Sequence, residues 1–306
     1  MNTSMPINPS HGLAADFAAC VRAIAKLAMP VAVARTGMLV LVIVDTATTG
    51  YFSSAELAYY GLGQAVFMVC MLIGVGMLVG TAVLSAQAVG AGSHSDCGVI
   101  WRVSGLHALA LGALFVVLAQ GGGYFYTLFG YDQDLTDGAS RVLVILTFGL
   151  PGQLLFTASI LFLEALNRPG PGLAIMVGAN VLNAVFNWLL IGGDLGWGGA
   201  GAAWATTAVR WLIAMAAVIY ILRMKDAAVY NVAGPLNEAR LLGRKLRRLG
   251  YPLGLAQGLE SAAFASLTLF AGLLGAEAVG AFQIVMNLVA FCFMAAIGVG
   301  TATAVH

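Results

Sequence analysis

The chain alternates between long apolar stretches and short polar links. A helix that crosses a bilayer needs about 20 mostly apolar residues. Eight stretches of this kind are present, joined by links rich in glycine, proline or acidic residues, with one long exception at 223–251. The predicted spanning helices lie near residues 23–49, 57–87, 99–119, 140–165, 171–193, 198–222, 252–274 and 278–305. The pattern therefore predicts an all-α polytopic membrane protein with eight transmembrane helices.

Composition supports this fold class and narrows the partners. Hydrophobic residues make up 60% of the chain and charged residues 9%, whereas a soluble domain carries about 25% charged residues. The 39 glycines fit membrane helices, whose backbones approach closely at small residues. The net charge of +1 gives no reason to expect a nucleic acid, and the scattered cysteines and histidines show no metal-ligand spacing. We expect a lipid bilayer, a small-molecule substrate, no cofactor and no metal cluster.

Basic residues orient the predicted helices. Cytoplasmic links carry an excess of Lys and Arg, and the link at 223–251 is the most basic, whereas alternate links such as 132–137 are acidic. This places the N-terminus in the cytoplasm, and we interpret the basic link as a solvated segment that faces the membrane surface. Its basic residues are Arg223, Lys225, Arg240, Arg244, Lys245, Arg247 and Arg248.

Two parts of the chain resemble each other. Pro30 and Pro252 each head a predicted helix, and Gly80-Thr81-Ala82 matches Gly300-Thr301-Ala302 at an offset of 220–222 residues. Six helices separate the copies, so both enter the membrane in the same sense. This is a parallel repeat, one of the architectures that secondary transporters use.

The repeat defines the expected organisation of the chain. We expect a complete N-terminal six-helix bundle at 1–222, the basic linker at 223–251, and the first two helices of a C-terminal bundle at 252–306. The second copy stops in the middle of an apolar run, so the sequence predicts a C-terminally truncated chain. A complete protein with halves of unequal length is the alternative.

Two carboxylates lie inside predicted spans, where charged groups are costly and by default mark ion or substrate pathways. Asp45 lies deep in the first span and Glu260 lies in the seventh. Residues three and four apart share a helix face, which places Gln257 and Phe264 beside Glu260. A buried carboxyl group is favoured in its neutral form, so it can exchange protons near neutral pH, and with amide oxygens it could equally hold a small cation. Both alternatives stay open, Na⁺ at Glu260 among them.

Amides and arginines add to the polar positions within spans. Interhelical hydrogen bonding is the alternative role for the amides, and Arg35 and Arg210 could each neutralise a carboxylate. The amides form two stripes at helical spacing, namely Asn180, Asn183 and Asn187 in the fifth span and Gln283 and Asn287 in the eighth.

These residues resemble the multidrug and toxic compound extrusion (MATE) family, and within it the NorM-like branch. The resemblance covers nearly the whole chain but is diffuse. It rests on Pro30 with Val44-Asp45-Thr46, Gly80-Thr81-Ala82 through Gly90-Ala91-Gly92, Pro171 through Asn187-Trp188, Leu249-Gly250-Tyr251-Pro252 through Glu260, and Gln283, Asn287 and Phe293-Met294.

The resemblance implies two six-helix lobes facing each other across a cleft, with export of amphipathic organic cations or drugs in exchange for Na⁺ or H⁺. Asp45 would be the carboxylate of the N-terminal lobe and Glu260 that of the C-terminal cation site. Asn183 and Asn187 would be the amides beside Asp45, and Gln283 would line the cavity. The family's cation site also uses an acidic residue on helix 10, which this chain does not contain.

The resemblance further implies a monomeric transporter in the bacterial inner membrane. Two alternatives remain. A lipid-linked sugar flippase would need a cationic cavity, for which the spans offer only Arg35 and Arg210. A non-transporting scaffold or inactive fragment is the other. An enzyme is not expected, because no nucleophile–base pair is found in the links.

Overall fold

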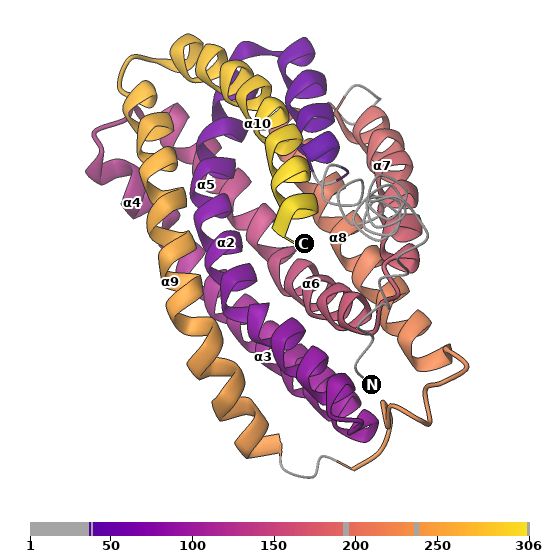
Figure 1. The fold of residues 1–306 in the computed structure, drawn as a ribbon. Coiled ribbons are helices and arrows are strands. Elements are labelled where there is room, and N and C mark those ends of the chain that lie inside the picture. Colours follow the sequence, from indigo (N-terminus) through magenta and orange to yellow (C-terminus); the bar gives the residue numbers. More distant parts are fainter. Residues whose placement is uncertain (1–36, 38, 192–195, 236–238, 305–306) are drawn as a thin grey trace, which may run out of the picture.

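The computed structural model describes residues 37, 39–191, 196–235 and 239–304, with side chains described as far as residue 290. These residues form helices joined by short links, and no strand occurs among them (Figure 1). The first described helix is Leu39–Phe52. It is followed by α2 (Ser54–Gly90), α3 (His94–Ala119), α4 (Gly122–Leu128), α5 (Gln133–Phe148), α6 (Leu150–Ala165), α7 (Gly170–Leu190), α8 (Gly198–Arg223), α9 (Ala239–Gly272) and α10 (Ala276–Ala304).

Helix α2 is the central element. It packs against α3, α5 and α6 on one side and against α9 and α10 on the other (Figure 1). Tyr60, Leu62, Phe67 and Leu78 along it are fully buried, which requires apolar neighbours on several sides. One core cluster therefore runs from α2 through α3, α5 and α6 to α8, with Val279 of α10 and Leu269 of α9 joining it.

The helices have the length and composition of membrane spans. Within the described ranges five helices are long and apolar enough to cross a bilayer, or six if the bent pair α5 and α6 is one span. Two shorter apolar segments, Leu39–Phe52 and Ala276–Ala290, accompany them. The chain is thus an all-helical polytopic membrane protein, as the hydrophobic pattern predicts.

The predicted span at 140–165 is not straight. It consists of α5 and α6, which meet at Gly149 with a bend of 40°. Pro151 stands in the first turn of α6 and cannot donate a backbone hydrogen bond to the preceding turn, so the proline favours a break there. Helix α3 packs closely against this bend at Gly112, where a Cβ would collide with Pro151.

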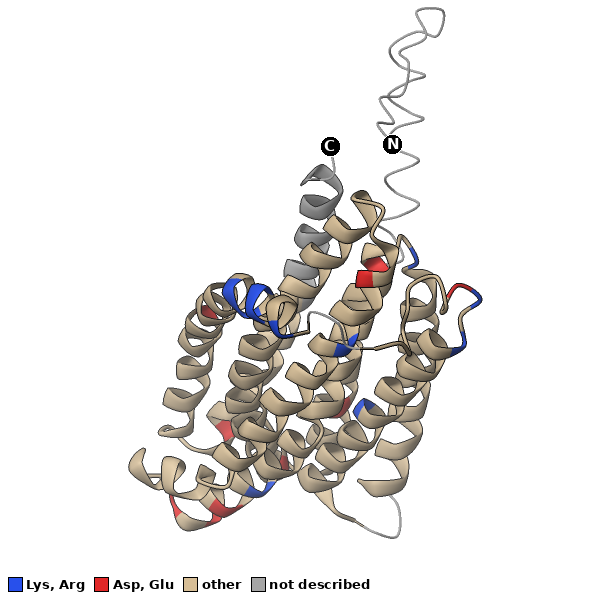
Figure 2. Ribbon diagram, turned by 90° about the horizontal axis from the view of Figure 1, so that it is seen from below, with Lys and Arg blue, Asp and Glu red and all other residues tan. Residues whose placement is uncertain are grey.

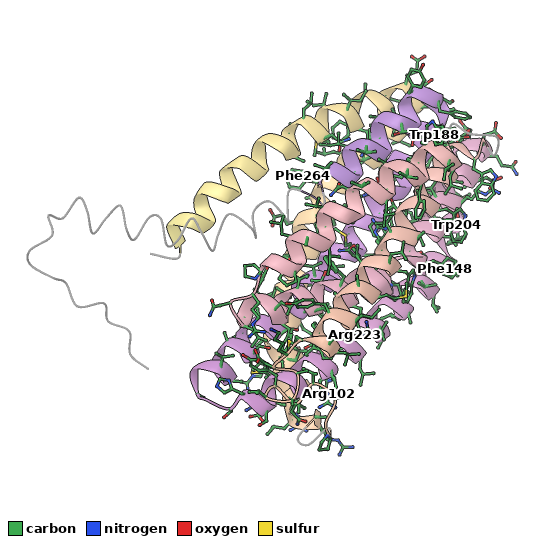
Figure 3. The ribbon with its side chains drawn as sticks, turned by 90° about the vertical axis from the view of Figure 1, so that its right-hand side faces the viewer. Arg102, Phe148, Trp188, Trp204, Arg223 and Phe264 are labelled. Atoms are coloured by element: carbon green, nitrogen blue, oxygen red, sulfur yellow. The ribbon has the colours of Figure 1, made fainter. Side chains whose placement is uncertain are left out.

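The outer surface of the bundle is apolar. Large side chains such as Trp188, at 72% exposure, and Leu259, at 66%, point away from the core, as expected for a lipid-facing surface. Figure 3 shows Trp188 and Trp204 toward one end of the bundle and Arg102 and Arg223 toward the other. Aromatic rings and basic groups are the usual residues at the two membrane–water boundaries.

Helix α9 approaches α2 closely along a run of glycines. A Cβ at Gly76 would lie 2.6 Å from Cα of Gly254, and one at Gly250 would collide with the carbonyl oxygen of Met77. Small residues at a spacing of four allow such backbone contact between membrane helices. Dispersion contacts over this α2–α9 seam therefore hold α9 in place.

The segment after α8 folds back on the first helices. Arg102 of α3 donates hydrogen bonds to the carbonyl oxygens of Gly234, Asn231 and Pro235, and Val232 is buried in a cluster with residues of α2, α3, α6 and α8. Within the predicted linker, residues 224–235 lie outside the helices, whereas 239–251 form the first turns of α9.

Candidate functional site

Asp45 lies at the centre of a buried polar cluster. The carboxylate is on the helix Leu39–Phe52 and is fully buried, as are Tyr60 of α2 and Asn183 of α7. Asn187, one turn further along α7, is 1% exposed, and Thr206 of α8 is 3% exposed. Four helices thus converge on one carboxyl group.

Every polar contact of Asp45 in this cluster comes from a neutral donor. Its Oδ1 accepts hydrogen bonds from Nδ2 of Asn183 at 3.1 Å and Nδ2 of Asn187 at 2.6 Å. Its Oδ2 accepts from the Tyr60 hydroxyl at 2.8 Å and from the Thr206 hydroxyl. A buried carboxylate without hydrogen bonds would cost several kcal/mol or more, so these donors make the buried position tolerable.

The donors are also linked to one another. Nδ2 of Asn183 contacts the Thr206 hydroxyl oxygen at 3.1 Å, and Nδ2 of Asn187 contacts Oδ1 of Asn183 at 3.2 Å. The Asn187 Oδ1 atom is buried and has no partner among the described residues. The same holds for Oγ1 of Thr49, on the same helix as Asp45. The site therefore contains spare acceptors as well as donors.

This arrangement accommodates two protonation states. An ionised carboxylate accepts all four hydrogen bonds. A protonated one has to donate a bond, and a hydroxyl can rotate from donor to acceptor, whereas an amide NH₂ cannot. Tyr60 and Thr206 both face Oδ2, so that oxygen can carry a proton without a change of backbone structure.

Arg210 is a buried cation on α8, one turn after Thr206. It is 5% exposed, donates to the carbonyl oxygen of Leu146 at 3.3 Å and lies over the ring of Phe67 at 4.1 Å. It is within electrostatic range of Asp45 and Tyr60, but within the described ranges it forms no ion pair with Asp45. Arg35 lies outside the described residues.

Glu260 occupies the opposite kind of environment. It is exposed on α9, and no hydrogen bond or ion pair joins it to another described residue. Phe264, one turn on, is also exposed. Gln257 faces inward instead, near Gly76, and its Oε1 is buried without a partner in the described part of the chain. The structure does not bring these three side chains together.

The amides of α10 lie beside a cavity. Asn287 donates to the hydroxyl of Thr46 at 2.9 Å, and Gln283 is buried with its Oε1 near Gly61 of α2. A cavity of about 820 Å³ lies between the helix Leu39–Phe52 and α10. Asn287 and Thr46 line it, together with Glu277 and mainly apolar residues.

Asn180 is the remaining predicted amide of α7. Asn180 donates to the carbonyl oxygen of Met176 in its own helix at 2.9 Å and not to Asp45. In the part of the chain that the structure describes, no group of three His, Cys, Asp or Glu side chains lies close enough to hold a metal ion.

Sequence reasoning missed Tyr60 and Thr206. Tyr60 follows Tyr59 near the start of a predicted span, where a tyrosine usually indicates the membrane boundary. Thr206 lies one turn before Arg210, and these two polar residues on one face of α8 could have indicated that this face meets the polar site. Both residues were unremarkable alone, because hydroxyl groups are common in membrane helices.

The chain is similar to a known protein family and to several of its members. Residues 30–189 and 252–306 match the family model MatE. The chain is 37% identical to a probable multidrug resistance protein NorM of Caulobacter vibrioides, over 92% of this chain and 60% of that protein. It is 28% identical to a multidrug resistance protein MdtK of Edwardsiella ictaluri, over 93% of this chain and 64% of that protein.

Solved structures share the fold. The eukaryotic MATE transporter AtDTX14 superimposes with a TM-score of 0.82 at 19% identity, covering 94% of this chain and 64% of the other. A multidrug resistance MATE family transporter of the MOP superfamily in an outward-facing conformation gives 0.77 at 22% identity, covering 93% and 63%. The chain spans about three-fifths of the length of the relatives that it matches.

Proposed function

Because the chain belongs to the MatE family and is similar to its NorM-like members, we propose that it acts in secondary active multidrug efflux. Members of this family are transporters and not enzymes. The substrates that we propose are amphipathic organic cations, exported in exchange for H⁺ or Na⁺.

We propose the following organisation in the membrane. Eight helices cross the bilayer, six of them in an N-terminal bundle at 1–222 and two in a second bundle at 252–306, with the basic linker at 223–251 between them. The N-terminus faces the cytoplasm of a bacterial cell, and the transporter is a monomer. The apolar outer surface and the basic residues near the first turns of α9 support this arrangement.

The buried Asp45 cluster carries the proposal. Four neutral donors on three neighbouring helices hold the carboxylate, and two of these donors can also accept. A proton that arrives at Oδ2 therefore changes the charge of the site and the direction of the Tyr60 or Thr206 hydrogen bond. A ligand shifts a conformational equilibrium only through different affinity for the two states, and repacking of these three helices around one carboxylate supplies such a difference.

The cavity beside α10 supports the proposed substrate class. Its volume of about 820 Å³ is in the range of about 300–1,000 Å³ for small-molecule sites. Its walls are mainly apolar, and Glu277 supplies a carboxylate. These are the features that bind an apolar molecule with a positive charge. Thr46 lines the cavity and is the next residue after Asp45, so substrate contact and ion contact meet on one helical turn.

The coupling energy depends on the charges that are exchanged. One elementary charge that crosses a potential of 100 mV is worth about 2.3 kcal/mol, or roughly a fiftyfold concentration ratio. Export of a monovalent cation costs what the entry of one coupling ion gains, so one-for-one exchange is driven by the concentration gradient of that ion, and the potential contributes only when a second ion enters.

Dye efflux from cells that produce the protein tests the proposal. We expect Asp45→Asn to reduce efflux of a cationic dye at least tenfold, because the amide cannot be deprotonated at this position. Thr48→Val is the matched control, since the Thr48 hydroxyl donates only within its own helix, to the carbonyl oxygen of Val44. Glu260→Gln tests the second carboxylate in the same assay.

Three results would count against the proposal. Unchanged efflux in Asp45→Asn would remove Asp45 from ion coupling, and unchanged efflux in Glu260→Gln would remove Glu260. Normal accumulation of the unsubstituted chain in the membrane without any efflux would favour a non-transporting scaffold.

A further inference from the structure

The first turns of α9 carry positive charge on one face. Arg240, Arg244, Arg247 and Arg248 are separated by four, three and one residues, and these spacings place them along one side of an α-helix. All four are exposed. Lys and Arg gather on these turns of α9 in Figure 2. We call these four side chains the arginine stripe.

The other face of the same turns is fixed against the bundle. Leu246 is 1% exposed, a Cβ at Gly243 would lie 3.3 Å from the Val103 side chain, and one at Gly250 would collide with Met77. The helix cannot rotate about its axis without losing these contacts. The arginine stripe is therefore held facing away from α2.

No described residue balances the charge of the stripe. No Asp or Glu occurs between residues 239 and 259, and no ion pair involving the stripe exists among the described residues; Glu238 lies outside the described residues. The ion pair that does form near this end, Arg168 with Asp226, joins the link after α6 to the segment after α8. Four unpaired guanidinium groups within a few turns repel one another, so an external anion would stabilise this surface.

The position of the stripe along α9 identifies its level in the membrane. From Tyr251 to Gly272, at about 1.5 Å per residue, α9 is long enough to cross a hydrocarbon core of about 30 Å. The stripe precedes this length and thus lies at the level of the lipid headgroups. Tyr251 marks the boundary, where tyrosine is enriched in membrane proteins.

A neighbouring histidine supplies a further polar atom. The ring of Tyr251 stacks on His107 of α3 with ring centres 5.7 Å apart, and Nε2 of His107 is buried without a hydrogen-bond partner in the described ranges. Arg247 is within electrostatic range of this imidazole. The headgroup end of the α3–α9 contact therefore combines an arginine, a tyrosine ring and an unpartnered ring nitrogen.

We propose that the arginine stripe binds the phosphodiester headgroups of anionic phospholipids and so anchors the start of α9 at the membrane surface. The planar guanidinium group donates paired hydrogen bonds to phosphate oxygens, and an anionic bilayer presents phosphates at the level where the stripe lies. The exposed Leu249, two residues before Tyr251, adjoins the acyl region.

Native mass spectrometry of the purified protein tests this proposal by counting retained lipid. The protein is reconstituted in phosphatidylcholine containing one-third phosphatidylglycerol and then extracted. We expect the unsubstituted protein to retain phosphatidylglycerol preferentially, and R247Q/R248Q to lower this preference about tenfold, from the loss of two headgroup-level charges. R247K/R248K keeps the charge and is expected to keep most of the preference.

The matched control is R223Q/K225Q, which removes two exposed basic residues outside the stripe. It should retain phosphatidylglycerol as the unsubstituted protein does. Thermal unfolding in phosphatidylcholine alone shows that R247Q/R248Q is folded. Equal retention by R247Q/R248Q, equal loss in both double variants, or displacement of the lipid by millimolar glycerol phosphate would each overturn the proposal, the last by identifying a free phosphate as the ligand.

Discussion

Asp45 and Glu260 look alike in the sequence, since each is a single carboxylate within an apolar helix. In the structure they differ in nearly every respect. Asp45 is fully buried and accepts four hydrogen bonds from three helices. Glu260 is exposed, and no described residue bonds to it. Their helices are also held differently, that of Asp45 partly by side-chain hydrogen bonds and that of Glu260 by glycine contacts along the α2–α9 seam.

This contrast separates two ways of placing a charge in a membrane protein. At Asp45 the hydrogen-bond network is part of the folded core, so the carboxylate contributes to stability and to the proposed ion coupling. At Glu260 the fold does not depend on the carboxylate, because backbone packing determines the position of α9.

The largest effect is expected from replacing each carboxylate by leucine. Asp45→Leu leaves four buried donors without their acceptor and should lower the free energy of unfolding by about 2–5 kcal/mol. Glu260→Leu should leave stability nearly unchanged. Thermal unfolding in the same detergent measures both variants, and similar melting temperatures for the two would contradict the contrast.

The next effect concerns the seam that carries Glu260. Gly250→Ala places a Cβ against the carbonyl oxygen of Met77, and overpacking of this kind should cost about 1–3 kcal/mol. Gly178→Ala on α7 is the matched control, because a Cβ there meets nothing within 4 Å and alanine favours a helix by about 1 kcal/mol. If Gly250→Ala were as stable as Gly178→Ala, close backbone contact would not be what holds α9.

A smaller effect separates the two buried amides. Asn187→Leu removes the 2.6 Å hydrogen bond to Asp45 and should destabilise the protein by about 1–2 kcal/mol. Gln257→Leu removes an Oε1 atom that has no partner within the described chain, so its cost should be near zero or the change should stabilise. Denaturation curves for the two leucine variants, recorded side by side, decide between these outcomes, and an equal loss would show that Gln257 is bonded after all.

The smallest effect is expected at Tyr131, in the link between α4 and α5. Its hydroxyl donates to the carbonyl oxygen of Leu269 in α9, so Tyr131→Phe should cost about 1 kcal/mol. Burial raises the pKa of Tyr131 to about 12, above the usual value of about 10 in an unfolded chain. The advantage over the phenylalanine variant should be constant below about pH 10 and shrink as the pH rises toward 12. A pH-independent difference across this window would argue against the buried bond.

The sequence predicted the helical elements better than their joints. Apolar runs located the helices, because bilayer thickness sets their length. The bend at Gly149 was missed because Pro151 lies within one apolar run of spanning length, and α4 was missed because its seven residues are too short to cross a bilayer.

For the site, the helical spacing of Asn183 and Asn187 placed both on one face of α7, and the structure brings that face to Asp45. The contributions of Tyr60 and Thr206 depend on how α2 and α8 pack around the carboxylate, and no local pattern encodes that packing. Gln257 and Phe264 lie three and four residues from Glu260, yet Gln257 faces α2 at the seam, whereas Glu260 and Phe264 lie on the outer face.

The hydrogen bonds from Arg102 to Asn231 and Pro235 have a mechanical consequence. They limit the reach of the segment between α8 and α9, because the carbonyl oxygen of Pro235 is bonded to Arg102 of α3 and α9 begins at Ala239. A fully extended chain covers at most about 3.6 Å per residue, so Ala239 can never be farther than about 14 Å from Pro235. Any displacement of the start of α9 away from Arg102 of α3 is therefore limited by this covalent length, while the hydrogen bond from Tyr131 to Leu269 restrains the other end of the helix.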